Sequence, residues 1–360
     1  MKIIDRYFIK QFLQTILFGL FAFTVIFVLV DLMENLDDFI DQKVPNLIIA
    51  EYYLYFIPEI VRLMTPVAAL LSCLFTVGRM ATQNELTAVK SSGVSLYRIM
   101  APFLATAFVI SLFSIYFGGF VVPMANKGKV AIEHNYMKKG LESAGVNIFF
   151  QDSNTRIVSI YTYDEARLQA NRVSIQEFDK NDLTHMTERI DAAVMRYDTL
   201  KRKWNLLNGL KRSFNADNET VEHFSLITLP NLNFLPADIM TKGQKPEEMS
   251  LTDLKNFYEN QARTGNNPTR WLIEYHSRYS FAMASFIVVF LGLPLAASKK
   301  RGGLALQFGI SLLFTFLYLG FMKISEAFGK NGVLDPLLTA WVANIIFMAF
   351  SLFNLYRVQK

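Results

Sequence analysis

The sequence predicts an α-helical polytopic membrane protein with six transmembrane helices, three on either side of an inserted all-β domain. Composition is the first observation: 52% of the 360 residues are hydrophobic and only 19% are charged, and the mean hydropathy is +0.25. Such a chain is too apolar for an ordinary soluble fold. The second observation is six apolar runs close to the roughly 20 residues that span a bilayer. The third is a region of about 140 residues in which short β-branched segments alternate with turn residues.

Six runs are long enough to be transmembrane helices. They cover residues 12–30, 52–75, 100–122, 279–297, 304–322 and 337–355. The first run resembles a signal peptide, but its length and the lack of a small-residue cleavage site favour a retained helix. The second run carries Glu59 and Arg62, whose i,i+3 spacing allows them to pair on one helix face.

The distribution of basic residues predicts the orientation of the helices. Lysine and arginine gather before the first run, between the second and third, between the fourth and fifth, and after the sixth. These residues are Lys2, Arg6 and Lys10; Arg79, Lys90 and Arg98; Lys299, Lys300 and Arg301; and Arg357 and Lys360. Because short basic loops stay in the cytoplasm, both termini are expected there. The loop after the first run has five carboxylates and only Lys43, so it and the inserted domain are expected on the opposite side.

The inserted region, residues 125–269, changes from helical to strand-like patterns, so we expect segments 1–124 and 270–360 to hold the helices. Its strand-like segments are 156–161, 172–178, 193–197 and 203–206. Their spacing favours a sandwich or an open roll, with Asn208-Gly209 as a tight turn. After the strands, Ser250 is a candidate N-cap for a helix that returns to the membrane.

Motifs that carry chemistry are missing from the chain. It has no Gly-rich phosphate loop ending in Gly-Lys-Ser or Gly-Lys-Thr, so ATP binding of the usual kind is excluded and the energy must come from a partner or an ion gradient. Four scattered histidines and the single Cys73 provide neither a metal site nor an intrachain disulfide. The basic residues flank apolar runs, which indicates contact with membrane lipids rather than nucleic acid. We therefore expect no enzyme, no metal and no cofactor in this chain.

A segment of about residues 80–96, between the second and third runs, reads as a short amphipathic helix. Leu86 and Val89 share one face, Glu85 lies beside them, and Gly93 is placed to end the helix. Such a helix suits docking into a groove of another protein. It equally suits a position among lipid headgroups, and the segment alone does not separate these interpretations.

Lysines near the external membrane edge, together with Arg62 deeper in the second run, are candidates for binding the phosphates of an anionic lipid. The candidates are Lys43, Arg62, Lys127, Lys129, Lys323 and Lys330. Each has an ordinary explanation: Arg62 pairs with Glu59, Lys323 pairs with Glu326, and the other lysines reach the interface. For a single residue the ordinary explanation is favoured, whereas together they predict a basic rim.

Short motifs throughout the chain resemble one known family. They are Ile4-Asp5-Arg6-Tyr7; Pro66-Val67, Gly78-Arg79, Asn84-Glu85-Leu86 and Ser92-Gly93; Trp204-Asn205-Leu206-Leu207-Asn208-Gly209; Glu274-Tyr275-His276-Ser277-Arg278; Gly292-Leu293-Pro294-Leu295-Ala296; and Leu334-Asp335-Pro336. In this order they resemble the LptF/LptG (YjgP/YjgQ) lipopolysaccharide export permeases. The resemblance implies a bacterial inner-membrane protein with a periplasmic β-jellyroll domain. It also implies a paralogous permease, a cytoplasmic ATPase dimer that binds ATP and Mg, and a periplasmic bridge protein as partners.

The same resemblance assigns roles to residues. The family's coupling helix matches the segment of residues 80–96 and its key carboxylate matches Glu85, which favours the docking interpretation. One departure is the acidic loop after the first run, where LptG-like members carry lysines that contact lipid A phosphates and this chain has only Lys43. The chain length and the opening motif favour the G paralogue.

These observations predict the permease subunit of an ABC transporter that extracts lipopolysaccharide from the inner membrane and passes it to a periplasmic bridge. The alternative is a membrane-anchored periplasmic binding or scaffold protein, whose helices only hold the β domain in place. The amphipathic segment favours transport, because an anchor needs no such element. A co-purifying ATPase would separate the two.

Overall fold

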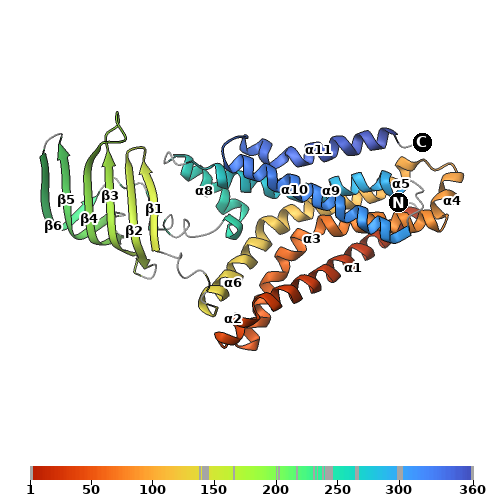
Figure 1. The fold of residues 1–360 in the computed structure, drawn as a ribbon, viewed down its shortest axis with the longest axis horizontal. Coiled ribbons are helices and arrows are strands. Elements are labelled where there is room, and N and C mark those ends of the chain that lie inside the picture. The colour runs from red at the N-terminus through yellow and green to blue at the C-terminus, as the bar shows by residue number, and fades with distance from the viewer. Residues whose placement is uncertain are drawn as a thin grey trace. The chain divides into compact units, whose positions relative to one another are not determined.

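The computed structural model describes residues 3–137, 139, 146–164, 167–199, 201, 203–215, 218–229, 232, 234–236, 239, 246–263, 267–297 and 303–357. The chain divides into two compact units. One consists of Met1–Met137 together with Thr269–Lys360, and the other of Lys138–Pro268. Figure 1 shows that the first unit is helical and that the second contains a sheet.

Among its described residues, the helical unit contains six helices long and apolar enough to cross a membrane, which confirms the predicted number of spans. Its elements are α1 (Ile3–Glu34), α2 (Leu36–Asp41), α3 (Asn46–Thr82), α4 (Glu85–Ser91), α5 (Leu96–Tyr116), the π-helical turn η1 (Phe117–Val121), α6 (Val122–Asn135), α9 (Thr269–Ala297), α10 (Gly303–Lys330) and α11 (Pro336–Arg357). The basic triplet 299–301 and Lys2 and Lys360 lie outside the described residues.

The third span extends further than the sequence indicated. Helices α5 and α6 join through η1 into one helix, Leu96–Asn135, and the helical unit continues to Met137. The predicted start of the β domain at residue 125 is therefore too early. The apolar run marks only the part of the helix that is suited to lipid, whereas α6 continues with polar residues such as Asn126 and Lys127.

Helices α3 and α9 form the centre of the helical unit, since 67% of the most apolar window of each is buried, against 11% for α1. Polar side chains connect the last three helices. The Asn344 side-chain amide on α11 donates to the Ser280 backbone carbonyl on α9 at 2.9 Å, and the Tyr318 hydroxyl on α10 donates to the Asn344 side-chain oxygen. Interhelical hydrogen bonds of this kind stabilise helix packing where lipid provides no hydrophobic driving force.

The second unit contains one six-stranded antiparallel sheet whose strands follow the sequence order. The strands are β1 (Val146–Ser153), β2 (Arg156–Asp164), β3 (Gln169–Phe178), β4 (Met186–Asp198), β5 (Lys203–Asn215) and β6 (Asn218–Leu229). The four predicted strand segments lie in β2 to β5. One face of the sheet is buried around Val158, Ile175, Ile190 and Trp204. The described pairings form a simple meander, with β1 and β6 at its edges.

A helix follows the sheet, as predicted. Helix α8 (Leu251–Arg263) follows the short turn η2 (Pro246–Glu248). Ser250 lies directly before α8, and its Oγ accepts a hydrogen bond from the Asp253 backbone N–H at 3.2 Å. The Ser250 backbone N–H in turn donates to the Asp253 carboxylate at 3.4 Å. This reciprocal arrangement is a capping box, and it confirms Ser250 as the N-cap.

The predicted turn at Asn208-Gly209 is wrong, because both residues lie inside β5. Asn208 has a φ of 51° and Arg172, in β3, a φ of 50°. Arg172 comes directly before Val173, and Asn208 comes directly before Gly209. Val173 and Gly209 lie in one row across the sheet, because both pair with Ala192 on β4. Asparagine tolerates this left-handed conformation in a turn or in a strand. Here β5 continues through it, and its pairing with β4 keeps the same register on both sides.

Gly209 allows the close approach of neighbouring strands, and its replacement should destabilise the sheet. A Cβ at this position would overlap the Asp191 carbonyl oxygen, which is a backbone atom, and would lie 2.5 Å from Cζ of Phe224. We expect Gly209→Ala to lower the stability of the β domain by about 1–3 kcal/mol. Limited proteolysis of the full chain during heating measures this change. Gly320→Ala is the control, because an added Cβ there meets no atom within 4 Å, and equal cleavage of the two variants would contradict the prediction.

Candidate coupling helix and lipid-contact residues

Helix α4 lies between two chain reversals at one end of the helical unit (Figure 1). The first reversal is at Asn84, which has a left-handed φ of 59°. The second is at Gly93, whose φ of 81° favours glycine. Ser95 then caps α5, accepting a hydrogen bond from the Arg98 backbone N–H at 3.4 Å. These local signals produce a short helix held at both ends, with Gly93 in the position that the sequence indicates.

The apolar face of α4 packs against its own bundle. Leu86 is 4% exposed and belongs to the core that contains Phe8 and Phe103, and Val89 packs against the same core. The other face exposes Thr87 and Lys90. Leu86 and Val89 therefore anchor α4, and a partner would meet the opposite face. A helix lying in headgroups would direct its apolar face towards lipid, so this packing argues against that interpretation.

Glu85 is half-buried at the start of α4 and contacts α1. The Tyr7 hydroxyl donates to Oε2 of Glu85 at 3.4 Å, and the Gln11 amide donates to the Tyr7 hydroxyl at 2.8 Å. The nearby Arg98 guanidinium forms an ion pair with Oδ2 of Asp5 at 2.7 Å. Asp5 and Tyr7 belong to the opening motif, but no role was predicted for either residue. Their partners lie 93 and 78 residues away along the chain, so the motif was the only signal for them.

Two of the lipid-contact candidates are held inside the helical unit. Arg62 pairs with Glu59 at 2.6 Å, as the spacing predicted, and its guanidinium lies 5.3 Å from the centroid of the Phe281 ring. Lys129 lies 3.5 Å from the Glu133 carboxylate and its ammonium lies 4.9 Å from the Phe56 ring centroid. Each of these cations is held by a carboxylate on its own helix and by a ring on another helix.

The remaining candidates are more exposed. Lys323 and Lys330 both pair with Glu326, at 2.8 and 2.6 Å. The first of these pairs confirms the expected i,i+3 contact. Lys43, in the loop between α2 and α3, and Lys127, on α6, are exposed. Four of the six candidates thus pair with carboxylates, and the structure brings Lys323 and Lys330 together on one of them.

A polar pocket within the helical unit is a feature that the sequence analysis missed. Its lining includes Arg62, Ser114, Gly118 of η1, Arg278 and Ser285. The Arg278 side chain is only 4% exposed and pairs with Glu274 at 3.3 Å. The signal available in the sequence was a glutamate and an arginine four residues apart next to an apolar run. Ionisable groups inside membrane proteins pair with one another and mark functional regions.

Metal chemistry finds no support in the described part of the chain, where no group of three or more His, Cys, Asp or Glu side chains is placed to hold an ion. The features that do stand out are six long apolar helices, an anchored helix between two of them and an inserted β domain. Together they define a polytopic membrane protein of the permease class.

Comparison with known proteins agrees with this class. The family model for the lipopolysaccharide export system permease LptF/LptG matches residues 6–357, and the chain belongs to this family. LptF of Escherichia coli (strain K12) is 21% identical over 97% of this chain and 93% of its own length. LptG of the same strain is 20% identical over 99% and 98%, and LptG of Haemophilus influenzae is 20% identical over 77% and 76%. The two paralogues are matched almost equally, so the preference for G stays a prediction.

Proposed function

We propose that this inner-membrane chain is one permease subunit of an ABC transporter that extracts lipopolysaccharide from the inner membrane and passes it to a periplasmic bridge protein. A separate cytoplasmic ATPase dimer binds ATP and Mg and supplies the energy. The observation that carries the proposal is helix α4, which is anchored in the bundle core by Leu86 and presents a polar face outward. Family membership supports the cargo, because the related permeases are named for lipopolysaccharide export.

The orientation in this proposal follows the charges beside the spans. Both termini and α4 lie in the cytoplasm, and the β domain lies in the periplasm. The ATPase docks on the exposed face of α4, with Glu85 as the carboxylate at the edge of the contact. Movement of α4 changes the packing of the bundle between two discrete states, and this change expels the lipid from its cavity.

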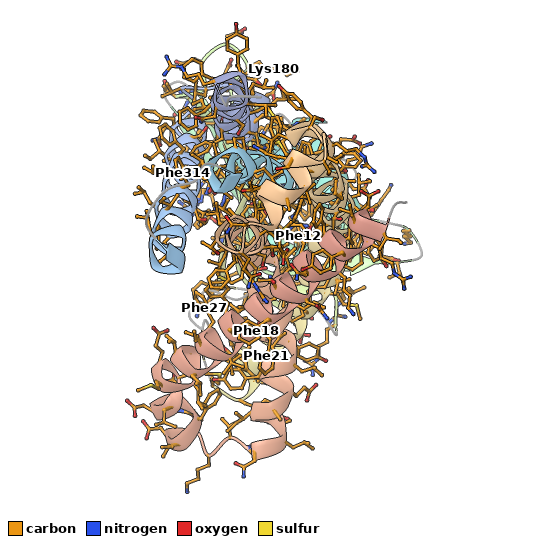
Figure 2. The ribbon with its side chains drawn as sticks, turned by 90° about the vertical axis from the view of Figure 1, so that its right-hand side faces the viewer. Phe12, Phe18, Phe21, Phe27, Lys180 and Phe314 are labelled. Carbon is orange, nitrogen blue, oxygen red and sulfur yellow. The ribbon has the colours of Figure 1, made fainter. Side chains whose placement is uncertain are left out.

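A paralogous permease covers the exposed face of α1 in the proposed complex. Figure 2 shows Phe18, Phe21 and Phe27 along α1 beyond the buried Phe12, and their exposed fractions are 73%, 70% and 38%. Exposed large aromatic side chains on this helix suit contact with lipid tails or with another apolar helix. The cavity for the cargo would form between the two permeases, and the exposed Lys43 would meet lipid phosphates at its outer end.

The periplasmic bridge docks on an edge of the sheet. Strands β1 and β6 are the edge strands among the described residues, and an edge strand offers unpaired backbone groups to a strand of another protein. The lipid chains then pass from the β domain to a similar surface of the bridge.

Detergent purification of the tagged chain tests this proposal. We expect mass spectrometry to find a cytoplasmic ATPase, a related permease and lipopolysaccharide in the purified material. The anchored scaffold predicts a different result, in which the chain purifies without an ATPase and the β domain performs its function on any membrane anchor. The packed α4 favours transport over this alternative.

A further inference from the structure

Two polar contacts connect the start of α1 with the segment that contains α4. Figure 1 places the N-terminal end of α1 beside α4 and α5. The Asp5 carboxylate lies 2.7 Å from the Arg98 guanidinium, and the Tyr7 hydroxyl donates to Glu85 at 3.4 Å. Asp5 is 8% exposed although it carries a charge. A charge that is this well covered is favourable only with a close partner, so the ion pair with Arg98 fixes the rotation of α1 about its axis.

The rest of α1 is held mainly by apolar packing near the same end. Its buried residues are Asp5, Phe8, Phe12, Ile16 and Gly19. The rings of Phe8 and Phe12 lie 5.7 and 5.3 Å from the Phe103 ring on α5. The residues of α1 beyond Gly19 are half-buried or exposed, although Leu32 packs against the cluster around Phe39. A helix of 32 residues is about 48 Å long, so a small tilt at its first turns produces a large displacement further along.

Arg98 is well placed to receive movement from α4. Only Ser92 to Ser95 separate α4 from α5, and Arg98 lies in the first turn of α5, bonded through its backbone N–H to Ser95. Apolar contacts such as those of Phe103 are not directional and would allow α1 to turn or slide. A charge-assisted contact has a defined geometry, so it transmits the direction of the movement.

We infer that the Asp5–Arg98 ion pair is a positioning contact that couples movement of α4 to α1, and through α1 to the side of the permease that faces its partner. This inference rests on the proposed function. Asp5 and Arg98 need not touch the ATPase or the lipid. Their role is to make α1 follow α4 when the ATPase changes its conformation.

A charge reversal tests the inference in the assembled complex reconstituted in proteoliposomes. Asp5→Arg and Arg98→Asp should each keep ATPase association and ATP hydrolysis, while the lipopolysaccharide released for each ATP hydrolysed falls by about tenfold. The double variant Asp5→Arg/Arg98→Asp restores the pair with reversed sign and should recover most of the release. Asp5→Glu keeps the charge and should resemble the original chain. Lys10→Glu, an exposed change of charge on the same part of α1, is the matched control and should have no effect.

Different failures have different meanings. Single variants with normal release per ATP would overturn the inference, and so would a double variant that is as impaired as the singles. If a reversed single variant does not accumulate, Asp5→Asn takes its place, because it removes the charge at constant size. Reduced lipopolysaccharide release per ATP in Asp5→Asn supports the inference, and normal release overturns it. If the unchanged complex releases no lipopolysaccharide on ATP addition, the proposed function fails, and the inference fails with it.

Discussion

Replacement of Glu85 with alanine should leave the chain in the membrane and reduce its association with the ATPase by about tenfold or more. The expected size follows from the loss of one charge-assisted contact, which contributes about 1.5–3 kcal/mol when well formed. Leu86 and the core around it remain unchanged in this variant, so α4 should keep its position. The measurement is the amount of ATPase that co-purifies with the variant. Lipopolysaccharide export is measured as well, in cells whose only copy of the permease is the variant.

Two variants serve as controls for this result. Tyr7→Phe removes only the hydroxyl that donates to Glu85 and keeps the carboxylate, so it should retain most of the association. Lys90→Ala truncates an exposed side chain on the same helix and distinguishes a specific carboxylate from a general sensitivity of α4. Normal ATPase association and normal export in Glu85→Ala would remove the basis for the assigned role of this residue.

Replacement of Trp204 with alanine should have the largest effect on stability. Trp204 is 1% exposed, its ring lies 4.9 Å from the Tyr197 ring and 5.3 Å from the Phe234 ring, and its indole N–H donates to the Phe234 carbonyl at 2.9 Å. Loss of a buried tryptophan costs about 3–5 kcal/mol, which is a large part of the 5–15 kcal/mol typical of a whole domain. We expect the β domain to become protease-sensitive and export to be lost.

ATPase association should survive in this variant, because α4 belongs to the other compact unit, which has its own core. Phe149→Ala is the control in the same sheet, since this ring is 64% exposed and its removal should hardly change protease resistance. A Trp204→Ala chain that resists protease as the original does would contradict the packing described for the sheet.

The features that the sequence predicted correctly depend on local patterns. The length of an apolar run identifies a span wherever it lies in the chain, and a β-branched segment between turn residues identifies a strand. The cap at Ser250 and the position of Gly93 depend on residues only a few positions away. The pairs Glu59–Arg62 and Lys323–Glu326 follow from helical spacing alone.

The errors and omissions have non-local causes. Asn208-Gly209 carries the signal of a turn, but pairing with β4 and β6 on both sides keeps it inside β5. The continuation of the third span into α6 was missed because the end of an apolar run was taken as the end of the helix. Polar residues mark where a helix leaves the apolar layer of the membrane, but the helix itself can continue beyond that point. The Asp5–Arg98 ion pair and the pocket containing Arg62 and Arg278 combine residues from distant segments, and only the packing of the helices reveals them.

The central claim is that a cytoplasmic ATPase acts on this permease through the exposed face of α4. Site-specific photo-cross-linking from Thr87, an exposed residue on that face, tests the claim most directly in living cells. The account predicts a light-dependent adduct with the ATPase from Thr87 and none from Lys180, an exposed residue between β3 and β4. An adduct between Thr87 and a periplasmic protein, or no adduct with the ATPase in cells that export lipopolysaccharide, would contradict it.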